Sequence, residues 1–362
     1  MIPIMRPKLP CAERLTPYLR TIDSSRTYSN FGPLAVSLED RLAGHYGLGS
    51  GRITTVANAT LGLTLALSAQ GVRPGALCLM PAWTFIASAH AALMAGLVPY
   101  FVDVDPRTWA LDIAAMPDAI ARAPAEVGAV MPVVPFGRPI DVAAWDGFRS
   151  RTGLPVVIDA ATGFDSLSPG ATPAVVSLHA TKVYGTGEGG FVISTDSSIV
   201  RDVRTRSNFG FESSRLARIA AANAKLSEYH AAVGHAALDE WPVARAEWFA
   251  AAQAYRARFR GATQVQLQKG FGETWVASTC VVSLADEGAA RAETALAKAG
   301  VDTRRWWGDG AHTHPATAAC PRTALPTTEA LARSALAVPF YRDLGGGEIG
   351  CVADLVLAAS GA

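Results

Sequence analysis

The sequence predicts an α/β protein, in which a large domain holds a mostly parallel mixed sheet between helices and a smaller C-terminal domain is α+β. From about residue 50 to residue 200, short apolar runs alternate with Ala/Leu-rich stretches. These runs are apolar at consecutive positions, as in strands that are buried on both faces. After about residue 217 the pattern changes to a long helix and then to a more polar region, which indicates a second domain.

The elements of the first domain follow from their length and their flanking residues. Short apolar runs bounded by turn residues predict strands, and the Ala-rich stretches between them predict helices. In the stretch Leu61–Leu67 leucine occupies every second position, as in a strand. Its Leu and Ala content nevertheless favours a buried helix. We expect strands within residues 76–82, 97–105, 127–134 and 154–161, and helices within residues 87–96 and 112–123.

The second part of the chain begins with the expected long helix, over residues 217–241. A strand is expected at 280–284, a helix at 288–300, and a closing ordered segment at 330–340. We place the boundary near residue 240, inside the long helix, which would link the two parts. The predicted domains are therefore residues 1–240 and 241–362.

Composition narrows the class of protein. The chain has 362 residues, of which 50% are hydrophobic and 17% charged, and its formal net charge is +1. This balance gives no reason to expect nucleic acid or an anionic membrane as a partner, because both select a basic excess. The five cysteines are odd in number and scattered, without a CxxC pair, so neither a disulfide framework nor a structural zinc site is expected. We expect a soluble cytoplasmic protein without a metal ion.

The sharpest chemical signal is the segment from Ser177 to Lys182, which precedes the glycine-rich turn GTGEGG. A primary amine that can form an imine and then act as a base is what an aldehyde cofactor requires. A nearby hydroxyl could bind the cofactor phosphate, and glycines allow the backbone to turn tightly beside a ligand. The alternative is a surface lysine before a hairpin, and the spacing alone leaves both open.

Three further segments carry possible ligand contacts, each with an ordinary alternative. Asp159 ends an apolar strand, where ligands of open α/β sheets gather, although an Asp there also caps helices. Thr60 lies at the start of a predicted helix, whose free N–H groups attract anions, or which is simply a capped helix. Phe85 follows a strand and could cover a flat ring, or belong to the core.

Taken in order, these segments resemble the DegT/StrS family of pyridoxal-phosphate-dependent sugar aminotransferases, which have the aspartate-aminotransferase fold. The pattern S-x-H-x-x-K-x-x-G-x-GEGG is highly specific, and the resemblance runs over nearly the whole chain. It is carried by YSNFGPL, ANATLGLTLAL, PAWTFIASAH, FVDVDPRTW, VVIDAAT, SLHATKVYGTGEGG, NAKLSEYHAAVG, TRRWWGDGAH and LPTTEALARSALAVPFYRDL.

The resemblance implies a role for each matching residue. Lys182 would hold pyridoxal 5′-phosphate as a Schiff base, Asp159 would pair with the pyridine nitrogen, and Phe85 would stack on the ring. The phosphate would be held by Ser177, Thr60 and the backbone at Ala59.

The resemblance also implies a site shared by two subunits. Asn223 matches a residue that reaches the phosphate from the neighbouring subunit, so we expect a homodimer. Asn30 and His312 fall on the substrate side of the site, while Trp306 and Trp307 could stack on a substrate or belong to the core. We expect His179 to be a buried, hydrogen-bonded residue without a catalytic step.

The chain departs from the family pattern in places. Three residues after Asp159 the family usually has Gln or His near the phenolic oxygen of the cofactor, and this chain has Thr162. The phosphate loop has Ala59 where Gly is frequent, and ASTCVVSL replaces a frequent Y-H-x-Y stretch. Substrate contacts from that stretch are therefore open.

The implied activity is a two-step (ping-pong) transamination. An amino acid, L-glutamate, would donate nitrogen through Lys182 to a keto group of a nucleotide-linked deoxysugar. Two alternatives remain: an aminotransferase that acts on a free keto-cyclitol or another small keto compound, and a non-catalytic relative that binds the cofactor.

Overall fold

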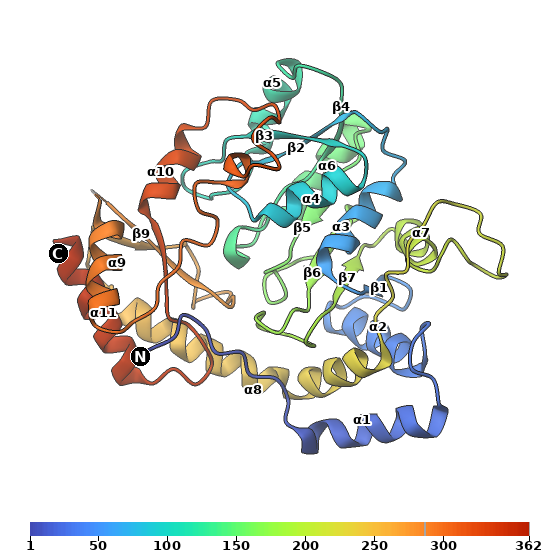
Figure 1. Cartoon of the computed structure of the whole chain (residues 1–362), viewed down its shortest axis with the longest axis horizontal. Helices are drawn as coiled ribbons and strands as arrows, with labels where there is room; N and C mark the ends of the chain where they lie inside the picture. Colours follow the sequence, from blue (N-terminus) through green and yellow to red (C-terminus); the bar gives the residue numbers. More distant parts are fainter. Residues whose placement is uncertain (286, 362) are drawn as a thin grey trace.

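A seven-stranded sheet forms the centre of the larger part of the chain in the computed structural model, which describes residues 1–285 and 287–361 (Figure 1). Hydrogen bonding gives the strand orders β3-β2-β4 and β1-β7-β6-β5, and parallel bridges between residues 130 and 156 and between 133 and 159 join the two. Among these described strands only β7 runs opposite to all the others, which confirms the mostly parallel mixed sheet. The strands are β1 (Ile53–Val56), β2 (Leu77–Pro81), β3 (Val98–Val102), β4 (Val127–Val130), β5 (Ile158–Asp159), β6 (Ala174–Ser177) and β7 (Gly190–Ile193).

Helices cover this sheet, as expected for buried parallel strands. The ambiguous stretch Leu61–Leu67 is helical, within α3, because its residues are almost all buried against the sheet and a neighbouring helix. Gly62 lets α3 approach closely, since a Cβ there would lie 2.8 Å from a side-chain carbon of Val175. The elements are α1 (Ala12–Ser25), α2 (Pro33–His45), α3 (Ala59–Ser68), α4 (Ile86–Met94), α5 (Met116–Ala121), α6 (Val142–Thr152) and α7 (Ser197–Ser207), with 3₁₀ turns η1 (Ile113–Ala115) and η2 (Pro135–Gly137).

The long helix α8 (Glu228–Arg258) begins about ten residues later than the sequence predicts. The prediction was wrong for residues 217–227, which form an irregular segment instead. Ser227 ends that segment by accepting a hydrogen bond from the backbone N–H of His230, as an N-cap does. Ala-rich composition alone therefore placed the helix start too early.

The C-terminal part is a three-stranded antiparallel sheet with helices, in agreement with the expected α+β character. Helix α11 packs against both α9 and α8. Residue 240 lies inside α8, and the division of the chain at that point stays a prediction. The elements are β8 (Val265–Leu267), β9 (Cys280–Leu284), α9 (Gly288–Lys298), η3 (Ala311–Thr313), α10 (Pro326–Ser334), β10 (Ala335–Val338) and α11 (Gly346–Ser360).

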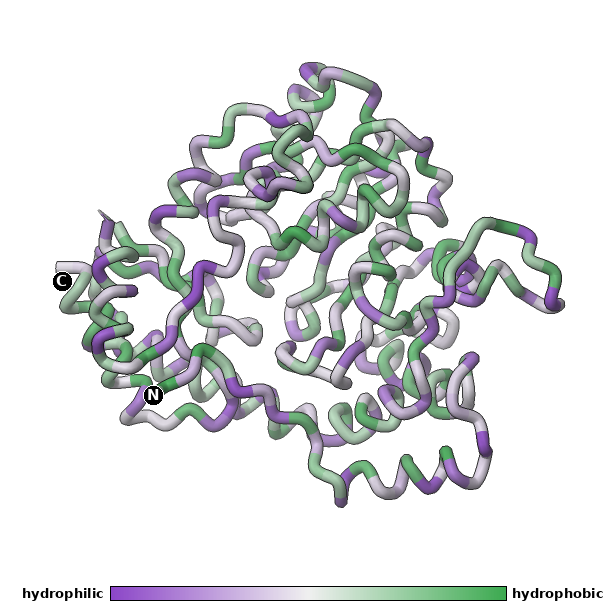
Figure 2. The backbone as a smooth tube through the Cα atoms, viewed as in Figure 1, coloured by the Kyte–Doolittle hydropathy of each residue, from purple (hydrophilic) through white to green (hydrophobic). Residues whose placement is uncertain are grey.

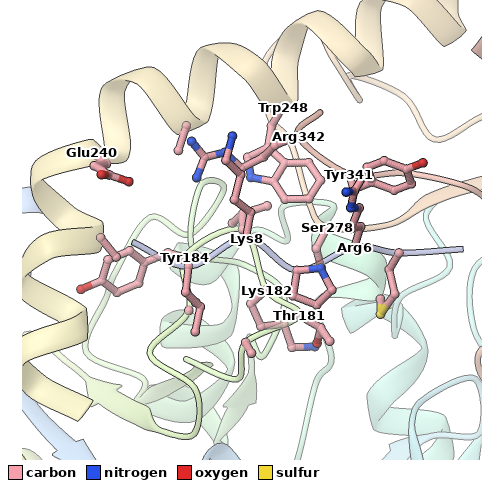
Figure 3. Close-up of a pocket in the computed structure, with 18 of the residues that line it drawn as sticks. Arg6, Lys8, Thr181, Lys182, Tyr184, Glu240, Trp248, Ser278, Tyr341 and Arg342 are labelled. Atoms are coloured by element: carbon pink, nitrogen blue, oxygen red, sulfur yellow. The ribbon is translucent and has the colours of Figure 1, made fainter. Parts of the chain in front are cut away.

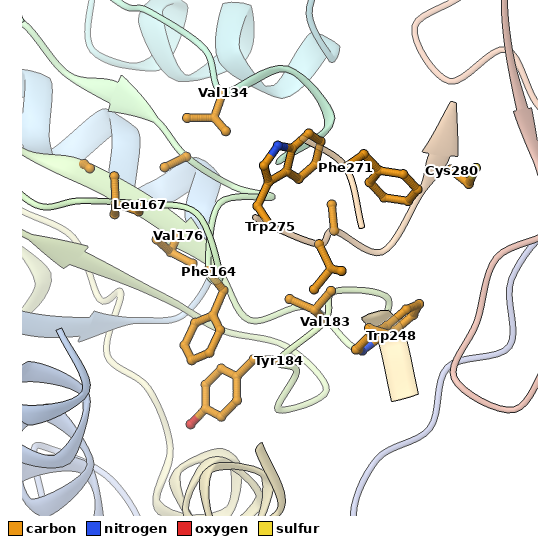
Figure 4. Packing of buried hydrophobic residues seen from close by; sticks show 14 of the residues in the cluster. Val134, Phe164, Leu167, Val176, Val183, Tyr184, Trp248, Phe271, Trp275 and Cys280 are labelled. Carbon is orange, nitrogen blue, oxygen red and sulfur yellow. The ribbon is translucent and has the colours of Figure 1, made fainter. Parts of the chain in front are cut away.

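One apolar cluster continues from the central sheet into the C-terminal part (Figure 4). Phe164 stacks on Tyr184 at 4.3 Å between ring centroids, and the same cluster includes Trp248, Phe271 and Trp275. Because each large ring removes apolar surface from water, this cluster ties the two parts of the chain together.

Hydrophilic and hydrophobic residues alternate along α1, which lies beside α8 (Figure 2). Tyr18 stacks on His235 of α8, and its hydroxyl donates to Asp239 at 2.5 Å. Within residues 1–285 and 287–361, no helix is long and apolar enough to cross a membrane.

Candidate active site

Lys182 lies in the connection between β6 and β7, at the carboxyl end of β6. Its backbone N–H donates to the carbonyl of His179 at 2.9 Å, and a bridge between His179 and Gly187 closes the base of the connection. Gly187 has a φ of 99°, which L-residues rarely adopt, so a glycine is needed where the chain turns back. The glycine-rich segment therefore fixes the backbone that carries the lysine.

Asp159 ends β5 and is buried, with 6% of its surface exposed. Its Oδ1 accepts from the N–H of Ala161 at 3.1 Å, and its Oδ2 accepts from the hydroxyl of Ser88 at 2.7 Å. A carboxylate has about four lone-pair sites, so acceptor capacity remains for a further donor.

Lys182 and Asp159 influence each other's titration. Burial raises the pKa of Asp159, against the hydrogen bonds from Ser88 and Ala161 and the charge of Lys182. Burial lowers the pKa of Lys182, and the charge of Asp159 opposes that change. The result is an amine that loses its proton more readily than an ordinary lysine, together with a carboxyl group whose charge burial opposes and hydrogen bonds support.

Ser177 is brought beside the start of α3 by the register of three strands. Gly190, the first residue of β7, is paired with Ser177 of β6 on one side and with Val56 of β1 on the other. A Cβ on Gly190 would lie 2.9 Å from the backbone nitrogen of Ala59, so the close approach of β7 to α3 requires glycine.

The first turn of α3 has free N–H groups. Asn58 is the N-cap, and its Oδ1 accepts from the N–H of Leu61 at 2.9 Å. The N–H groups of Ala59 and Thr60 precede the first intrahelical bond, and neither donates to an acceptor within the described residues. A helix N-terminus of this kind attracts anions, and the hydroxyls of Thr60 and Ser177 add donors.

Phe85 is the N-cap of α4, and its side chain is unusually open for an aromatic residue, with 55% of its surface exposed. It follows β2 directly, at the same edge of the sheet as Asp159. Thr162 is half-buried and donates to the carbonyl of Val134 at 3.2 Å. Its hydroxyl oxygen keeps acceptor capacity, because this bond uses only the hydrogen.

The remaining predicted residues lie in three places. Asn30 is exposed with a φ of 63°, in a turn before α2. Asn223 is exposed, and its Oδ1 accepts from Lys225 at 2.7 Å. The carbonyl of its neighbour Ala224 accepts from the N–H of Ala57, just before α3, at 2.7 Å.

His312 is buried in the turn η3, beside the end of β2. The N–H of Ala311 donates to the carbonyl of Ala82 at 2.8 Å, which places this turn next to the segment that carries Phe85. Burial, with the charge of Arg322, lowers the pKa of His312. Trp307 stacks on Phe136 at 3.8 Å between centroids and is buried, so it belongs to the core.

His179 is hydrogen-bonded as expected, but it is not buried. Its Nδ1 pairs with the hydroxyl of Thr181 at 2.7 Å, and its Nε2 lies 3.6 Å from a carboxylate oxygen of Glu188. Since 44% of the side chain is exposed, the expectation of a buried histidine was wrong.

Sequence reasoning missed the residues that surround Lys182 from the two ends of the chain. A small cavity beside Lys182 is lined by the N-terminal segment 5–10, by α8 and by residues 340–342 (Figure 3). Arg6, Lys8 and Arg342 bring positive charge to it, although Glu240 also lines it and Arg342 pairs with Glu247 at 2.6 Å. Nothing in the proline-rich N-terminal segment indicates that it contacts a lysine so distant in the sequence.

Comparison with known proteins identifies the family. Residues 11–357 match the family model of the DegT/DnrJ/EryC1/StrS aminotransferases. Protein Rv3402c of Mycobacterium tuberculosis is 33% identical over 249 residues, which cover 64% of this chain and 59% of that protein. The dTDP-4-amino-4,6-dideoxy-D-glucose transaminase of Shigella dysenteriae is 32% identical over 237 residues, covering 64% of this chain and 63% of the enzyme. The matched region thus spans about three-fifths of these curated relatives.

Solved structures agree over almost the whole chain. A Bacillus cereus protein assigned to the PLP-dependent aminotransferases superposes with a TM-score of 0.91 at 28% identity, covering 98% of this chain and 99% of that one. DesI, solved in the presence of its TDP-sugar product, gives a TM-score of 0.87 at 30% identity, covering 98% of this chain and 92% of DesI.

The grouped residues fit pyridoxal phosphate by their chemistry. The fit is clearest at Gly190, where a Cβ would lie 2.9 Å from the backbone nitrogen of Ala59. Glycine there brings Ser177, its partner in β6, close to the free N–H groups of α3, which together form a cradle suited to an anion. The amine of Lys182, the carboxylate of Asp159 and the open ring of Phe85 lie at the same edge of the sheet. The chain therefore belongs to the DegT/DnrJ/EryC1/StrS family of aminotransferases, whose cofactor is pyridoxal phosphate.

Proposed function

We propose that this protein is a homodimeric, cytoplasmic enzyme that moves an amino group from L-glutamate to a keto group of a nucleotide-linked deoxysugar, in two successive half-reactions. The observation that carries the proposal is the placement of a buried carboxylate, Asp159, and an amine of lowered pKa, Lys182, at one edge of the sheet, where the charge of each acts on the other. Perturbed pairs of titratable groups gather at catalytic sites.

Pyridoxal phosphate, when bound, supplies an aldehyde carbon that bonds to amines and a ring that delocalises negative charge. Lys182 is the residue that would hold it covalently. Once released, its Nζ would move a proton from the α-carbon of the donor, because a lowered pKa leaves more of the amine neutral at working pH. The same amine can return the proton on the way to product.

Asp159 would keep the pyridine nitrogen protonated. An ionised carboxylate that accepts hydrogen bonds from Ser88 and Ala161 and still has lone pairs free suits that role. A hydrogen bond between charged groups of this kind contributes about 1.5–3 kcal/mol. Phe85 would cover one face of the ring, and Thr162 would lie near the phenolic oxygen.

The phosphate would be held by the N–H groups and hydroxyls at the start of α3 and by Ser177. Its charge is favourable there because the helix dipole and the N–H groups point at it. We assign the holding of the phosphate to Ala59, Thr60 and Ser177, with Asn223 reaching in from the neighbouring copy of the chain.

The acceptor is proposed from the relatives and from charge. DesI was solved with a TDP-sugar product, and the Shigella dysenteriae relative is named for a dTDP-amino sugar. Arg6, Lys8 and Arg342 beside Lys182 would favour substrates that carry carboxylate or phosphate groups. Asn30 and His312 are assigned to the sugar side.

The visible absorbance of the cofactor-loaded protein tests the donor half-reaction. We expect a band from the lysine-bound cofactor that disappears on adding L-glutamate, because nitrogen moves onto the cofactor. Lys182→Ala should lack the band and lose turnover by roughly a thousandfold or more. Sustained turnover by Lys182→Ala would contradict the assignment, and a band that L-glutamate leaves unchanged would point to another donor or to a non-catalytic protein.

The acceptor is tested by following return of the band after adding a keto compound to the aminated protein. A dTDP-linked 4-keto-6-deoxysugar should restore the band, and a free keto-cyclitol at equal concentration should not. Restoration by the keto-cyclitol alone would replace the nucleotide-sugar proposal.

A further inference from the structure

We propose that the hydroxyls of Thr84 and Ser88 form a relay that positions the Asp159 carboxylate and holds it ionised, so that both are positioning residues for cofactor binding. The proposal rests on the proposed function, because it assigns Asp159 to the cofactor ring. Neither hydroxyl is among the residues to which the family resemblance gives a role.

The three side chains form a continuous chain of short hydrogen bonds. The Oγ of Ser88 lies 2.7 Å from Oδ2 of Asp159, and the Oγ1 of Thr84 lies 2.8 Å from the Oγ of Ser88. Ser88 is 0% exposed and Thr84 is 1% exposed. Such bonds are stronger away from water, and a buried hydroxyl without a partner would be costly.

The donor direction of this chain follows from the charge at its end. An ionised carboxylate can only accept, so the single hydrogen of Ser88 must point at Asp159. Ser88 then has only lone pairs left for Thr84, and Thr84 must donate to it. The other acceptor near Thr84 is the carbonyl of Phe85, at 3.5 Å, which is too long to compete well.

The relay also fixes Asp159 in position. The hydroxyl of Ser88 donates to Oδ2 of Asp159, and the N–H of Ala161 donates to Oδ1. The carboxylate is therefore held from two sides and cannot rotate freely. Both donors stabilise the negative charge, against the burial that raises the pKa of this group.

Helix α4 couples this relay to the ring-stacking position. Phe85 is its N-cap, and Ser88 is three residues further on, where side chains lie on one face of a helix. The N–H of Ser88 donates to the carbonyl of Phe85 at 3.2 Å. One helical turn therefore sets both the residue that would cover the ring and the residue that orients Asp159.

Cofactor affinity measured against pH tests the relay. In Ser88→Ala the pKa of Asp159 should rise further, so a proton competes with the cofactor at a higher pH. We expect the dissociation constant for pyridoxal phosphate, relative to wild type, to grow as pH falls from about 8 to about 5.5 and to reach about tenfold, the effect of losing one hydrogen bond to a charged group. A purely structural defect would weaken binding equally at every pH.

Matched variants separate the hydroxyl from the space that it fills. Thr84→Val removes the hydroxyl at nearly constant shape and should give a smaller change in the same direction, while Thr84→Ser should behave as wild type. Ser68→Ala is the control, because the hydroxyl of Ser68 bonds to the carbonyl of Thr64 within α3, away from Asp159. A pH-independent change, or none, in Ser88→Ala overturns the relay.

A double-mutant cycle on the cofactor-free protein tests the bond without the cofactor. Unfolding of Ser88→Ala, Asp159→Asn and the double variant should show a coupling equivalent to about a tenfold change in the folding equilibrium. If Asp159→Asn binds the cofactor as wild type does while the coupling persists, the assignment of Asp159 to the ring fails and the hydrogen bond stands. If the Ser88 and Asp159 substitutions show no coupling in unfolding, the proposed relay is wrong.

Discussion

The carboxyl group of Asp159 is held in a site where its charge is costly. Burial raises its pKa, whereas Ser88, Ala161 and Lys182 act in the opposite direction. An ionised carboxylate in that position does not stabilise the fold, so we infer that the charge of Asp159 serves a bound partner.

Replacing Asp159 with Asn should change how the stability of the fold depends on pH. Because the folded-state pKa is raised above the ordinary value of 3.8, the folded protein binds this proton more tightly than the unfolded chain. Wild-type stability should therefore fall as pH rises from about 4 through the folded pKa, and the variant should lack this loss. The loss amounts to about 1.4 kcal/mol for each pH unit that separates the folded-state pKa from the unfolded-state pKa. Urea unfolding of the cofactor-free proteins between about pH 4 and pH 8 measures this.

The control for that experiment is Ser68→Ala, which lies outside the site and changes no titratable group. Its curve should run parallel to that of the wild type. Parallel curves for Asp159→Asn as well would show that Asp159 titrates as an ordinary carboxyl group.

At this scale the sequence allows Lys182 and Asp159 to be predicted, but not Thr84 or Ser88. Lysine and a strand-end aspartate carry recognisable chemistry. A serine one turn into a helix has no such signal, and its partner lies 71 positions away in the sequence. Only the three-dimensional structure, in which Ser88 of α4 meets Asp159 at the end of β5, reveals the contact.

At the scale of elements, the anion cradle depends on the junction of three of them. The pairing of Gly190 with both Ser177 and Val56 sets the distance between β6 and the start of α3. The helix at Leu61–Leu67 could be predicted, because Leu and Ala have a high helix propensity and an apolar stretch of this kind is buried. The start of α8 could not, because the Ala-rich segment before it is helical in composition but ends at the Ser227 cap.

Gly190→Ala tests this junction. The added Cβ would meet the backbone of Ala59 at 2.9 Å, so α3 must shift away from Ser177. We expect a loss of about 1–3 kcal/mol in the free energy of unfolding, typical of overpacking. Affinity for pyridoxal phosphate should fall at least about tenfold, as for one lost charge-assisted contact.

Pyridoxal without its phosphate is the matched ligand for that variant. Its affinity should change far less, because it does not use the cradle. Equal losses for pyridoxal and pyridoxal phosphate would mean that Gly190 does not act through the phosphate site.

On the scale of the whole molecule, α8 joins the central sheet to the C-terminal part. Arg245 of α8 donates to Asp165 at 2.5 Å, and Asp165 also accepts from the N–H of Val276 at 3.0 Å. The fold class could be predicted from alternation of apolar runs and helices. The contact of the N-terminal segment with Lys182 could not, because nothing in a short proline-rich stretch specifies a partner so distant in sequence.

Mixing two inactive variants tests whether the site is shared between subunits. A mixed dimer has one subunit with Lys182→Ala and one with Asn223→Asp. If Asn223 acts on the phosphate of the neighbouring subunit, both substitutions fall in the same site, and the other site is intact. Random reassociation should therefore restore about a quarter of wild-type activity, since half of the dimers are mixed and each has one intact site. Recovery is measured as turnover after mild dissociation and dilution.

The control mixes Lys182→Ala with Ser177→Ala, two residues of the same chain. No mixed dimer then has an intact site, so activity should stay near that of the Ser177 variant alone. No recovery in either mixture would place Asn223 in its own chain's site.

The antiparallel course of β7 has a consequence for the order of folding. Residues 174–193 form a local hairpin of β6 and β7. Because the paired residues are near each other in the sequence, these contacts form quickly. The pairing of β7 with β1 joins segments far apart in the chain and is slower to form. We therefore expect the hairpin that carries Lys182 to form before the phosphate cradle during refolding, and recovery of tight cofactor binding to report the pairing of β7 with β1.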